Sequence, residues 1–225
     1  LDAPNNSNAT LLDPTTKTPE FTPDVPGIYD VMVSDLEATE LITIRVYAGT
    51  WRGAIVGQDA EGRPVSDLSC VLCHQNLGAD QFTPWKQTGH AEIFSQNLDN
   101  STYYRESCFA CHTVGYDPEV DNGGFDDAVD YQAFLNSGLL GNPGDNWTTM
   151  LADFPQAARR ANAQCEVCHG PQWEQPGVTT PAHGPTNPAG EPRASLSSNV
   201  CGTCHGEPLR HARFQQWQLS GHANY

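Results

Sequence analysis

Long hydrophobic runs are missing from this chain of 225 residues, in which hydrophobic side chains make up only 38%. A helix that spans a bilayer needs about 18 to 20 consecutive apolar residues. No such run occurs, so we predict no membrane span. The chain also begins without a charged and apolar leader, and we expect a mature or trimmed protein. Its 20 glycines and 17 prolines favour many turns and disfavour a helical bundle.

Basic residues are scarce as well. Lysine and arginine together number 11, against 27 aspartates and glutamates, which gives a formal net charge of -16 at pH 7. A field of this sign repels nucleic-acid phosphates and anionic lipid headgroups. We therefore exclude nucleic acid and anionic membrane surfaces as partners.

Cysteine, in contrast, is plentiful and follows one pattern. All 8 cysteines lie in Cys-X-X-Cys pairs, and a histidine follows each pair directly. This is the pattern of c-type haem attachment. Two thiols one short turn apart can bond to the two vinyl groups on one haem edge, while the next residue ligates the iron. The four motifs are Cys70-Val-Leu-Cys73-His74, Cys108-Phe-Ala-Cys111-His112, Cys165-Glu-Val-Cys168-His169 and Cys201-Gly-Thr-Cys204-His205.

A single Cys-X-X-Cys pair also fits a zinc knuckle, a redox pair or a disulfide. None of these alternatives explains a histidine at the same offset in all four motifs. We therefore predict four covalently bound c-type haems and no disulfide. Because covalent attachment is completed outside the cytoplasm, we expect an extracellular or cell-surface protein, with the periplasm as the alternative.

Four histidines remain after the motifs are assigned, one for each haem: His90, His183, His211 and His222. Methionine is a weaker competitor, because the chain has only Met32 and Met150 and neither is near a motif. Eight histidines for eight axial positions predict four bis-histidine, six-coordinate haems. The alternative for each remaining histidine is a solvated or hydrogen-bonded surface residue.

An internal repeat supports two of these histidines. Residues 82–91 and 214–223 share the pattern Phe-X-X-Trp-X-X-Ser/Thr-Gly-His-Ala. The aromatic rings can cover a macrocycle face, and a glycine before the histidine permits close approach of a haem. We expect His90 and His222 to be iron ligands on this basis. His211 lies in a predicted helix at 209–219, and His183 lies in a loop after the third motif.

The motifs divide the chain into a tetrahaem cytochrome region, residues 61–225, and an N-terminal segment, residues 1–60. Roughly 160 residues serve four haems, too few to build an ordinary apolar core as well. We therefore predict a mostly irregular, haem-cored fold with short helices, largely unfolded without its haems.

The N-terminal segment is predicted to be β-structure. Residues 27–34 and 40–47 alternate with period two, which places Tyr29, Val31 and Val33 on one face. The turn at 24–29 resembles the tyrosine corner of immunoglobulin-like sandwiches. A full sandwich needs about 100 residues. We therefore predict a partial immunoglobulin-like segment, completed by another segment or another subunit.

Two minor patterns remain open. An acidic loop between the second and third motifs favours a solvated surface over a Ca2+ site, because its spacing does not match an EF-hand: Asp117, Glu119, Asp121, Asp126, Asp127 and Asp130. Four Asn-X-Ser/Thr sequons are either glycosylation sites or chance occurrences: Asn5, Asn8, Asn100 and Asn146.

Taken together, these motifs resemble the multihaem c-type cytochromes whose distal ligands lie in Trp-X-X-Ser/Thr-Gly-His-Ala segments. The closest resemblance is to extracellular tetrahaem cytochromes that polymerise into nanowires. The matching segments are 108–116, 165–171 with His183, and 201–223. The order of motifs is also similar to tetrahaem electron carriers of ammonia oxidisers and to multihaem nitrite and hydroxylamine enzymes.

The resemblance implies closely stacked haems along which electrons hop, and identical subunits joined in a filament. In such filaments a histidine of one subunit ligates a haem of its neighbour, and His222 is the candidate here. We expect electron transfer without bond chemistry, with other redox proteins or extracellular electron acceptors as partners. The alternatives are a soluble periplasmic carrier, a reductase of a small nitrogen or sulfur oxyanion with one open haem, and an adhesive surface protein.

Overall fold

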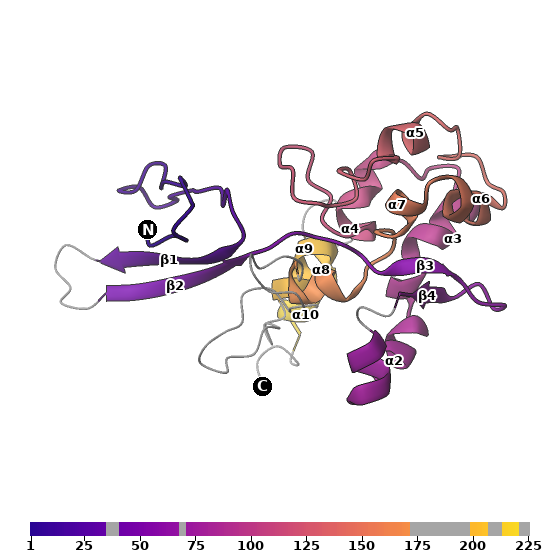
Figure 1. Cartoon of the computed structure of the whole chain (residues 1–225), viewed down its shortest axis with the longest axis horizontal. Coiled ribbons are helices and arrows are strands. Elements are labelled where there is room, and N and C mark those ends of the chain that lie inside the picture. Colours follow the sequence, from indigo (N-terminus) through magenta and orange to yellow (C-terminus); the bar gives the residue numbers. More distant parts are fainter. Residues whose placement is uncertain (35–40, 68–70, 172–198, 207–212, 221–225) are drawn as a thin grey trace. The chain divides into compact units, whose positions relative to one another are not determined.

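The structure, a computed structural model of the whole chain, describes residues 1–34, 41–67, 71–171, 199–206 and 213–220. The chain divides into two compact units, Leu1–Thr50 with Pro171–Glu191, and Trp51–Gly170 with Pro192–Tyr225. The described residues form short helices and two small antiparallel sheets, joined by irregular segments (Figure 1). The prediction of a mostly irregular fold with short helices is therefore confirmed.

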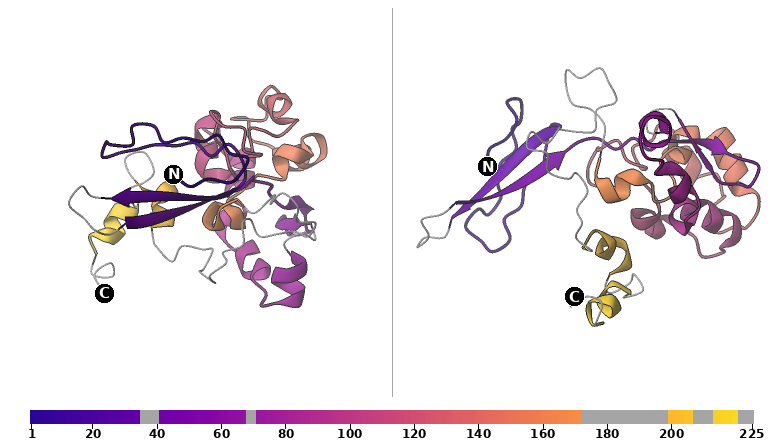
Figure 2. Two further views of the ribbon diagram at one scale, coloured as in Figure 1. Left: turned by 60° about the vertical axis from the view of Figure 1, so that its left-hand side comes forward. Right: turned by 90° about the horizontal axis from the view of Figure 1, so that it is seen from below.

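The first unit contains a two-stranded ribbon in which β1 (Gly27–Ser34) pairs antiparallel with β2 (Leu41–Ala48) (Figures 1 and 2). The predicted strands at 27–34 and 40–47 are thus confirmed, the second to within one residue. Tyr29 lies opposite Val46, and Val31 lies opposite Ile44. Because side chains alternate between the faces of a strand, these pairs share one face, and the ribbon is amphipathic.

A tyrosine holds the entry to this ribbon. The Tyr29 side chain is fully buried, and its hydroxyl donates to the Val25 carbonyl at 2.8 Å. The Val25 backbone N–H donates back to the same hydroxyl at 3.2 Å. The Phe21 ring packs on Tyr29 with a centroid distance of 5.5 Å. The hydrogen bond from a buried tyrosine to the backbone four residues upstream is the interaction that defines a tyrosine corner.

The second unit begins with a hairpin of β3 (Ile55–Gln58) and β4 (Pro64–Ser66) and continues with short helices. Among the described helices, none combines the length and the apolar character needed to cross a membrane. The helices are η1 (Leu72–Leu77), α2 (Phe82–Lys86), η2 (Gly89–Ala91), α3 (Ile93–Asn100), η3 (Glu106–Cys108), α4 (Phe109–His112), α5 (Tyr131–Leu135), α6 (Asn146–Asp153), α7 (Pro155–Ala158), α8 (Cys165–His169), α9 (Asn199–His205) and α10 (Arg213–Gln218).

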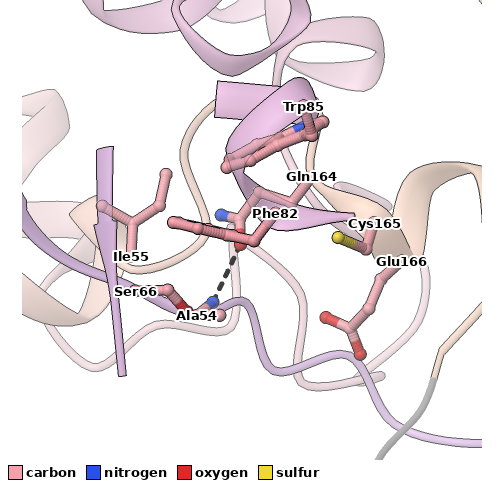
Figure 3. Close-up of a pocket in the computed structure, with 8 residues that line it drawn as sticks. All are labelled: Ala54, Ile55, Ser66, Phe82, Trp85, Gln164, Cys165 and Glu166. Atoms are coloured by element: carbon pink, nitrogen blue, oxygen red, sulfur yellow. Dashed lines mark hydrogen bonds between the residues drawn. The ribbon is translucent and has the colours of Figure 1, made fainter. Parts of the chain in front are cut away.

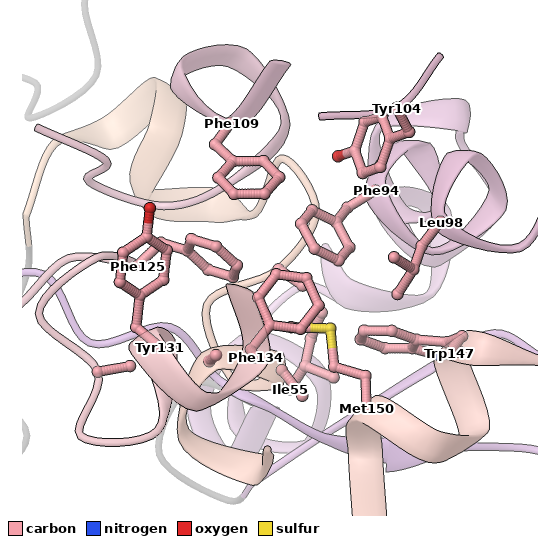
Figure 4. Packing of buried hydrophobic residues seen from close by; sticks show 14 residues of the cluster. Ile55, Phe94, Leu98, Tyr104, Phe109, Phe125, Tyr131, Phe134, Trp147 and Met150 are labelled. Carbon is pink, nitrogen blue, oxygen red and sulfur yellow. The ribbon is translucent and has the colours of Figure 1, made fainter. Parts of the chain in front are cut away.

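This unit has an aromatic core of its own (Figure 4). Phe94 is its centre: the ring lies 5.6 Å from Phe109, 5.3 Å from Phe125 and 6.1 Å from Phe134 between centroids. All four rings are fully buried. The expectation that the haem region cannot build an ordinary apolar core is therefore wrong for this segment. A few aromatic side chains bury enough area to form a core in a short stretch of chain.

The same core decides two minor questions. Met150 is fully buried beside Phe134 and Trp147, so its sulfur is not placed to ligate an iron (Figure 4). The amide nitrogen of Asn146 donates to the carbonyls of Leu98 at 2.9 Å and Asn142 at 2.6 Å. Because this nitrogen is buried and hydrogen-bonded, the sequon at Asn146 is not a glycosylation site in the folded protein.

Candidate haem-binding sites

The described attachment motifs lie on short helices. The third motif forms the whole of α8, the fourth ends α9 at His205, the second ends α4 at His112, and Cys73 and His74 belong to η1. On a helix, residues three and four apart share one face. In the third and fourth motifs, which are α-helical throughout, the two cysteines three residues apart therefore share one helix face, as attachment of one haem edge requires.

The cysteine side chains are accessible to differing degrees. Cys165, Cys168 and Cys201 are exposed, whereas Cys108, Cys111 and Cys204 are half-buried. None of these six described cysteines is joined in a disulfide. Both cysteines of the third motif and the first cysteine of the fourth therefore lie at the protein surface.

Three of the four motifs lie close together in the second unit. Helix α4, which carries the second motif, contacts α9, which carries the fourth. The third motif also lies near the fourth. Partial burial raises the pKa of the Cys168 thiol, and Cys201 of the fourth motif is close enough to raise this pKa further. Segments far apart in the sequence thus bring three attachment sites to one region.

A buried tyrosine positions the histidine of the second motif. The Tyr104 hydroxyl forms a hydrogen bond with His112 Nδ1 at 3.2 Å, and the two rings are stacked at an interplanar angle of 18°. Tyr104 is itself packed against Phe94 with a centroid distance of 5.3 Å. Burial, with a smaller contribution from Cys108, raises the pKa of Tyr104 well above its ordinary value, so the phenol stays neutral.

This contact fits an axial ligand. A metal-bound histidine nearly always uses its second ring nitrogen in a hydrogen bond that fixes the tautomer and the ring orientation. With Nδ1 of His112 engaged by Tyr104, Nε2 is the nitrogen that can carry the lone pair toward an iron. The sequence analysis did not identify Tyr104, because nothing in its local pattern distinguishes it from other core aromatic residues.

The third motif is held by two buried polar residues (Figure 3). Glu166, inside the motif, accepts hydrogen bonds from the backbone N–H groups of Arg52 at 3.2 Å and Gly53 at 2.8 Å. Gln164 Oε1 accepts from the Ala54 N–H at 2.8 Å. These bonds fix the start of α8 against the irregular segment that leads into β3. Glu166 occupies a variable position of the motif, so the sequence alone did not predict this role.

A pocket beside this helix connects the third motif with the first copy of the repeat (Figure 3). Phe82 and Trp85 line it from α2, and Cys165 and Glu166 line it from α8. The Trp85 indole also donates a hydrogen bond to the Ala163 carbonyl at 3.0 Å. An aromatic surface therefore lies next to a thiol of the third motif.

The described parts of the two copies of the repeat, residues 82–91 and 214–220, share their local contacts. Within each copy the Phe and Trp rings are in contact, with centroid distances of 5.4 and 5.8 Å. The hydroxyl of Thr88 donates to the Trp85 carbonyl at 2.8 Å, and Ser220 donates to the Trp217 carbonyl at 2.7 Å. The second copy begins in α10, which confirms the predicted helix over Arg213–Gln218.

A backbone hydrogen bond fixes His90 in the first copy. The Ala163 N–H donates to the His90 carbonyl at 3.0 Å, and Ala91 is fully buried. The His90 side chain itself is exposed. Its ring meets that of His205, with 6.0 Å between centroids and 61° between planes. The structure therefore brings one predicted distal histidine next to one predicted proximal histidine.

The glycines near these histidines differ in what they require. A Cβ on Gly202 would lie 2.9 Å from the Phe214 ring, so this glycine lets α10 pack on α9. A Cβ on Gly89 would meet no described atom within 4 Å, and the backbone there is not left-handed. The chain's own packing therefore gives no reason for a glycine before His90, whereas close approach of a bound group would.

The remaining predicted site residues are either exposed or outside the described part of the chain. His74 and His169 are exposed on their helices. Cys70, His183, His211 and His222 lie outside the described residues, as does the side chain of Cys73.

The acidic loop is organised by its own backbone. Asp127 Oδ2 accepts hydrogen bonds from the N–H groups of Asn122 at 2.7 Å and Gly123 at 2.8 Å. Asp126 accepts from the Asp117 N–H at 3.1 Å, and burial, with nearby carboxylates, raises the pKa of Asp126. In the described part of the chain no group of three or more histidine, cysteine, aspartate or glutamate residues is arranged to hold a metal ion.

We compared the chain with known families, curated proteins and solved structures. None of them matches it. Paired cysteines on short helices, a hydrogen-bonded His112 and open space beside Gly89 are compatible with covalently bound haem.

Proposed function

We propose that the protein transfers electrons outside the cell through four covalently bound bis-histidine c-type haems, as a subunit of a polymeric filament. The observation that carries the proposal is the proximity of three attachment motifs within one unit. Helix α4 contacts α9, and Cys201 lies close enough to Cys168 to contribute to the raised pKa of its thiol. Attachment sites this close favour electron transfer from one site to the next.

The chain's own groups have two tasks in this proposal. The cysteines of each motif attach the group, and the histidine that follows ligates its iron from one side: Cys70, Cys73 and His74; Cys108, Cys111 and His112; Cys165, Cys168 and His169; Cys201, Cys204 and His205. The distal ligands are His90, His183, His211 and His222. When bound, haem supplies a one-electron iron couple. Tyr104 and Glu166 orient the ligands by the hydrogen bonds described above.

Electron transfer, rather than catalysis, follows from the number of ligands. Eight histidines for eight axial positions leave no iron position for a substrate. The buried position of Met150 removes one competitor for these positions. A reductase would need one iron with an open position, and its spectrum would then contain a high-spin signal.

The test is a spectroscopic count on the full chain produced with its haems attached. We expect four haems per chain by mass spectrometry and only low-spin signals by electron paramagnetic resonance. As a matched control, replacing both cysteines of the third motif with alanine should remove one haem. A high-spin haem in the unaltered protein would refute the purely conducting role, and a chain without covalent haem would refute the whole proposal.

The filament part of the proposal rests on the family resemblance and on an apolar face of the ribbon. Val33, Ile42 and Ile44 are 43%, 65% and 52% exposed, and the strand register places them on one face. A two-stranded ribbon with such a face is marginal in water until something covers it. Identical subunits would cover it in a filament.

Electron microscopy of native extracellular material tests this part. We expect filaments, and we expect Ile44→Lys to shorten or abolish them, while Thr43→Lys, on the opposite face, has a smaller effect. Monodisperse particles under conditions that preserve assemblies would leave a soluble carrier as the function.

A further inference from the structure

We infer that His90 is the distal ligand of the haem attached at the fourth motif, so that His90 and His205 bind the same iron from opposite sides. This inference rests on the proposed function, because it takes the attached haems as given. It assigns one distal histidine to one haem, which the order of the motifs alone leaves undetermined.

The distance between the two rings supports this assignment. A histidine nitrogen binds a metal at about 2.0 Å and lies about 1.1 Å from its ring centre, so two opposed ligands have ring centres about 6.2 Å apart. The His90 and His205 centroids are 6.0 Å apart. The 61° angle between the ring planes is compatible with opposed ligands, because each ring can rotate about the common nitrogen–metal axis.

The backbone around His90 is fixed on both sides of the histidine. Before it, the Trp85 indole donates to the Ala163 carbonyl, and the His90 carbonyl accepts from the Ala163 N–H, both at 3.0 Å. After it, Asn162 Oδ1 accepts from the Phe94 N–H at 2.8 Å and caps α3. The backbone that carries the exposed imidazole therefore loses little freedom when the ring binds a metal.

The surroundings favour a bound group over a simple contact between two rings. The open space beside Gly89 lies next to His90, and no packing within the described chain requires that glycine. The rival assignment is the third motif, because Ala163 precedes Cys165 by two positions and Phe82 and Trp85 of the same repeat line a pocket with Cys165. The ring of His90 nevertheless meets His205 of the fourth motif.

The assignment has a structural consequence. Ligation by His90 and His205 would join α9, near the C-terminal end of the chain, to the η2 turn that follows α2. A metal bond between such distant residues restrains the unfolded chain as a cross-link does. Loss of His90 should therefore make the segment from residue 199 onward more sensitive to proteolysis.

The test combines His90→Ala with removal of single haems in the full-length, haem-loaded protein. In the otherwise unaltered chain, His90→Ala should turn one of four haems high-spin by electron paramagnetic resonance. When Cys201 and Cys204 are both alanine, so that the fourth haem is not attached, the same substitution should add no high-spin signal. When Cys165 and Cys168 are alanine instead, the signal should return. The matched control is His222→Ala in the chain that lacks Cys201 and Cys204. This variant should still contain a high-spin haem, because His222 then ligates a haem other than the fourth.

Three results would overturn the inference. They are four low-spin haems in His90→Ala, a high-spin signal from His90→Ala that persists without the fourth haem, or loss of that signal when the third haem is absent. Should the cysteine variants not fold, a density map of the unaltered protein decides, because it shows whether His90 and His205 flank the iron of the haem on Cys201 and Cys204. A protein without covalent haem would instead contradict the proposed function itself.

Discussion

The contact between Tyr104 and His112 predicts a defined change in one haem potential. In Tyr104→Phe the ring remains in the core, where it packs edge-on against Phe94, and only the hydroxyl is lost. An iron-bound His112 carries its proton on Nδ1 and donates it to the Tyr104 oxygen, which makes the imidazole a stronger electron donor. A stronger donor favours the oxidised iron, so removing the hydroxyl should raise the potential of the haem at the second motif.

The strength of the hydrogen bond sets an upper limit on the shift, because only the part of its energy that differs between the two oxidation states moves the potential. A buried hydrogen bond between neutral groups contributes about 0.5 to 1.5 kcal/mol. For a one-electron couple, about 1.4 kcal/mol corresponds to about 59 mV. We therefore expect an upward shift of up to about 60 mV in one of four potentials, with the other three nearly unchanged.

The assay is a spectroelectrochemical titration of the loaded protein, with Tyr103→Phe as the matched control. Tyr103 is the neighbouring tyrosine and is 81% exposed, so its hydroxyl should not affect any haem. Low-spin spectra should be retained in both variants, because neither substitution removes an iron ligand. Unchanged potentials in Tyr104→Phe, or a downward shift, would refute the reasoning.

Three further predictions concern stability, each measured by urea unfolding of the loaded protein. Phe94→Ala should lower the free energy of unfolding by about 3 to 5 kcal/mol, because it opens a cavity at the centre of the aromatic core. A loss below about 1 kcal/mol would show that the haems, rather than this core, stabilise the unit. Glu166→Ala should lower the free energy of unfolding by about 2 to 4 kcal/mol, because the buried Gly53 N–H loses its acceptor. Glu166→Gln keeps one acceptor oxygen and should lose less. An equal loss in both variants would contradict this reasoning. Tyr29→Phe should lower the free energy of unfolding of the first unit by about 1 to 2 kcal/mol, because the hydrogen bond to the Val25 carbonyl is lost. An unchanged urea midpoint would contradict the tyrosine corner.

The local structure of the chain was largely predictable. Alternating side chains placed β1 to the residue and β2 to within one, and the turn at 24–29 resembled a tyrosine corner, in which Tyr29 bonds to Val25. The repeat predicted two similar segments, and both contain the same hydroxyl-to-carbonyl bond, from Thr88 and from Ser220. Such features depend on residues a few positions apart, so their pattern is visible in the sequence.

The aromatic core was missed for a physical reason. Phe94, Phe109, Phe125 and Phe134 are spread over short helices and loops and show no periodicity of their own. Counting residues per haem suggested that no core could exist, because the count ignored how much area each phenyl ring buries. The role of Tyr104 was missed for the same reason, since its partner His112 is defined only once the core is packed.

The sequence by itself determined the chemistry of the chain: paired thiols with an adjacent histidine can be recognised wherever they occur, because the atoms that must react lie within one helical turn. Only the tertiary structure decided which of these groups meet. His90 and His205 are far apart along the chain, and their contact depends on the hydrogen bond that fixes His90 to Ala163 and on the packing of the second unit. Contacts of that kind depend on the sum of many distant interactions, so no local pattern predicts them.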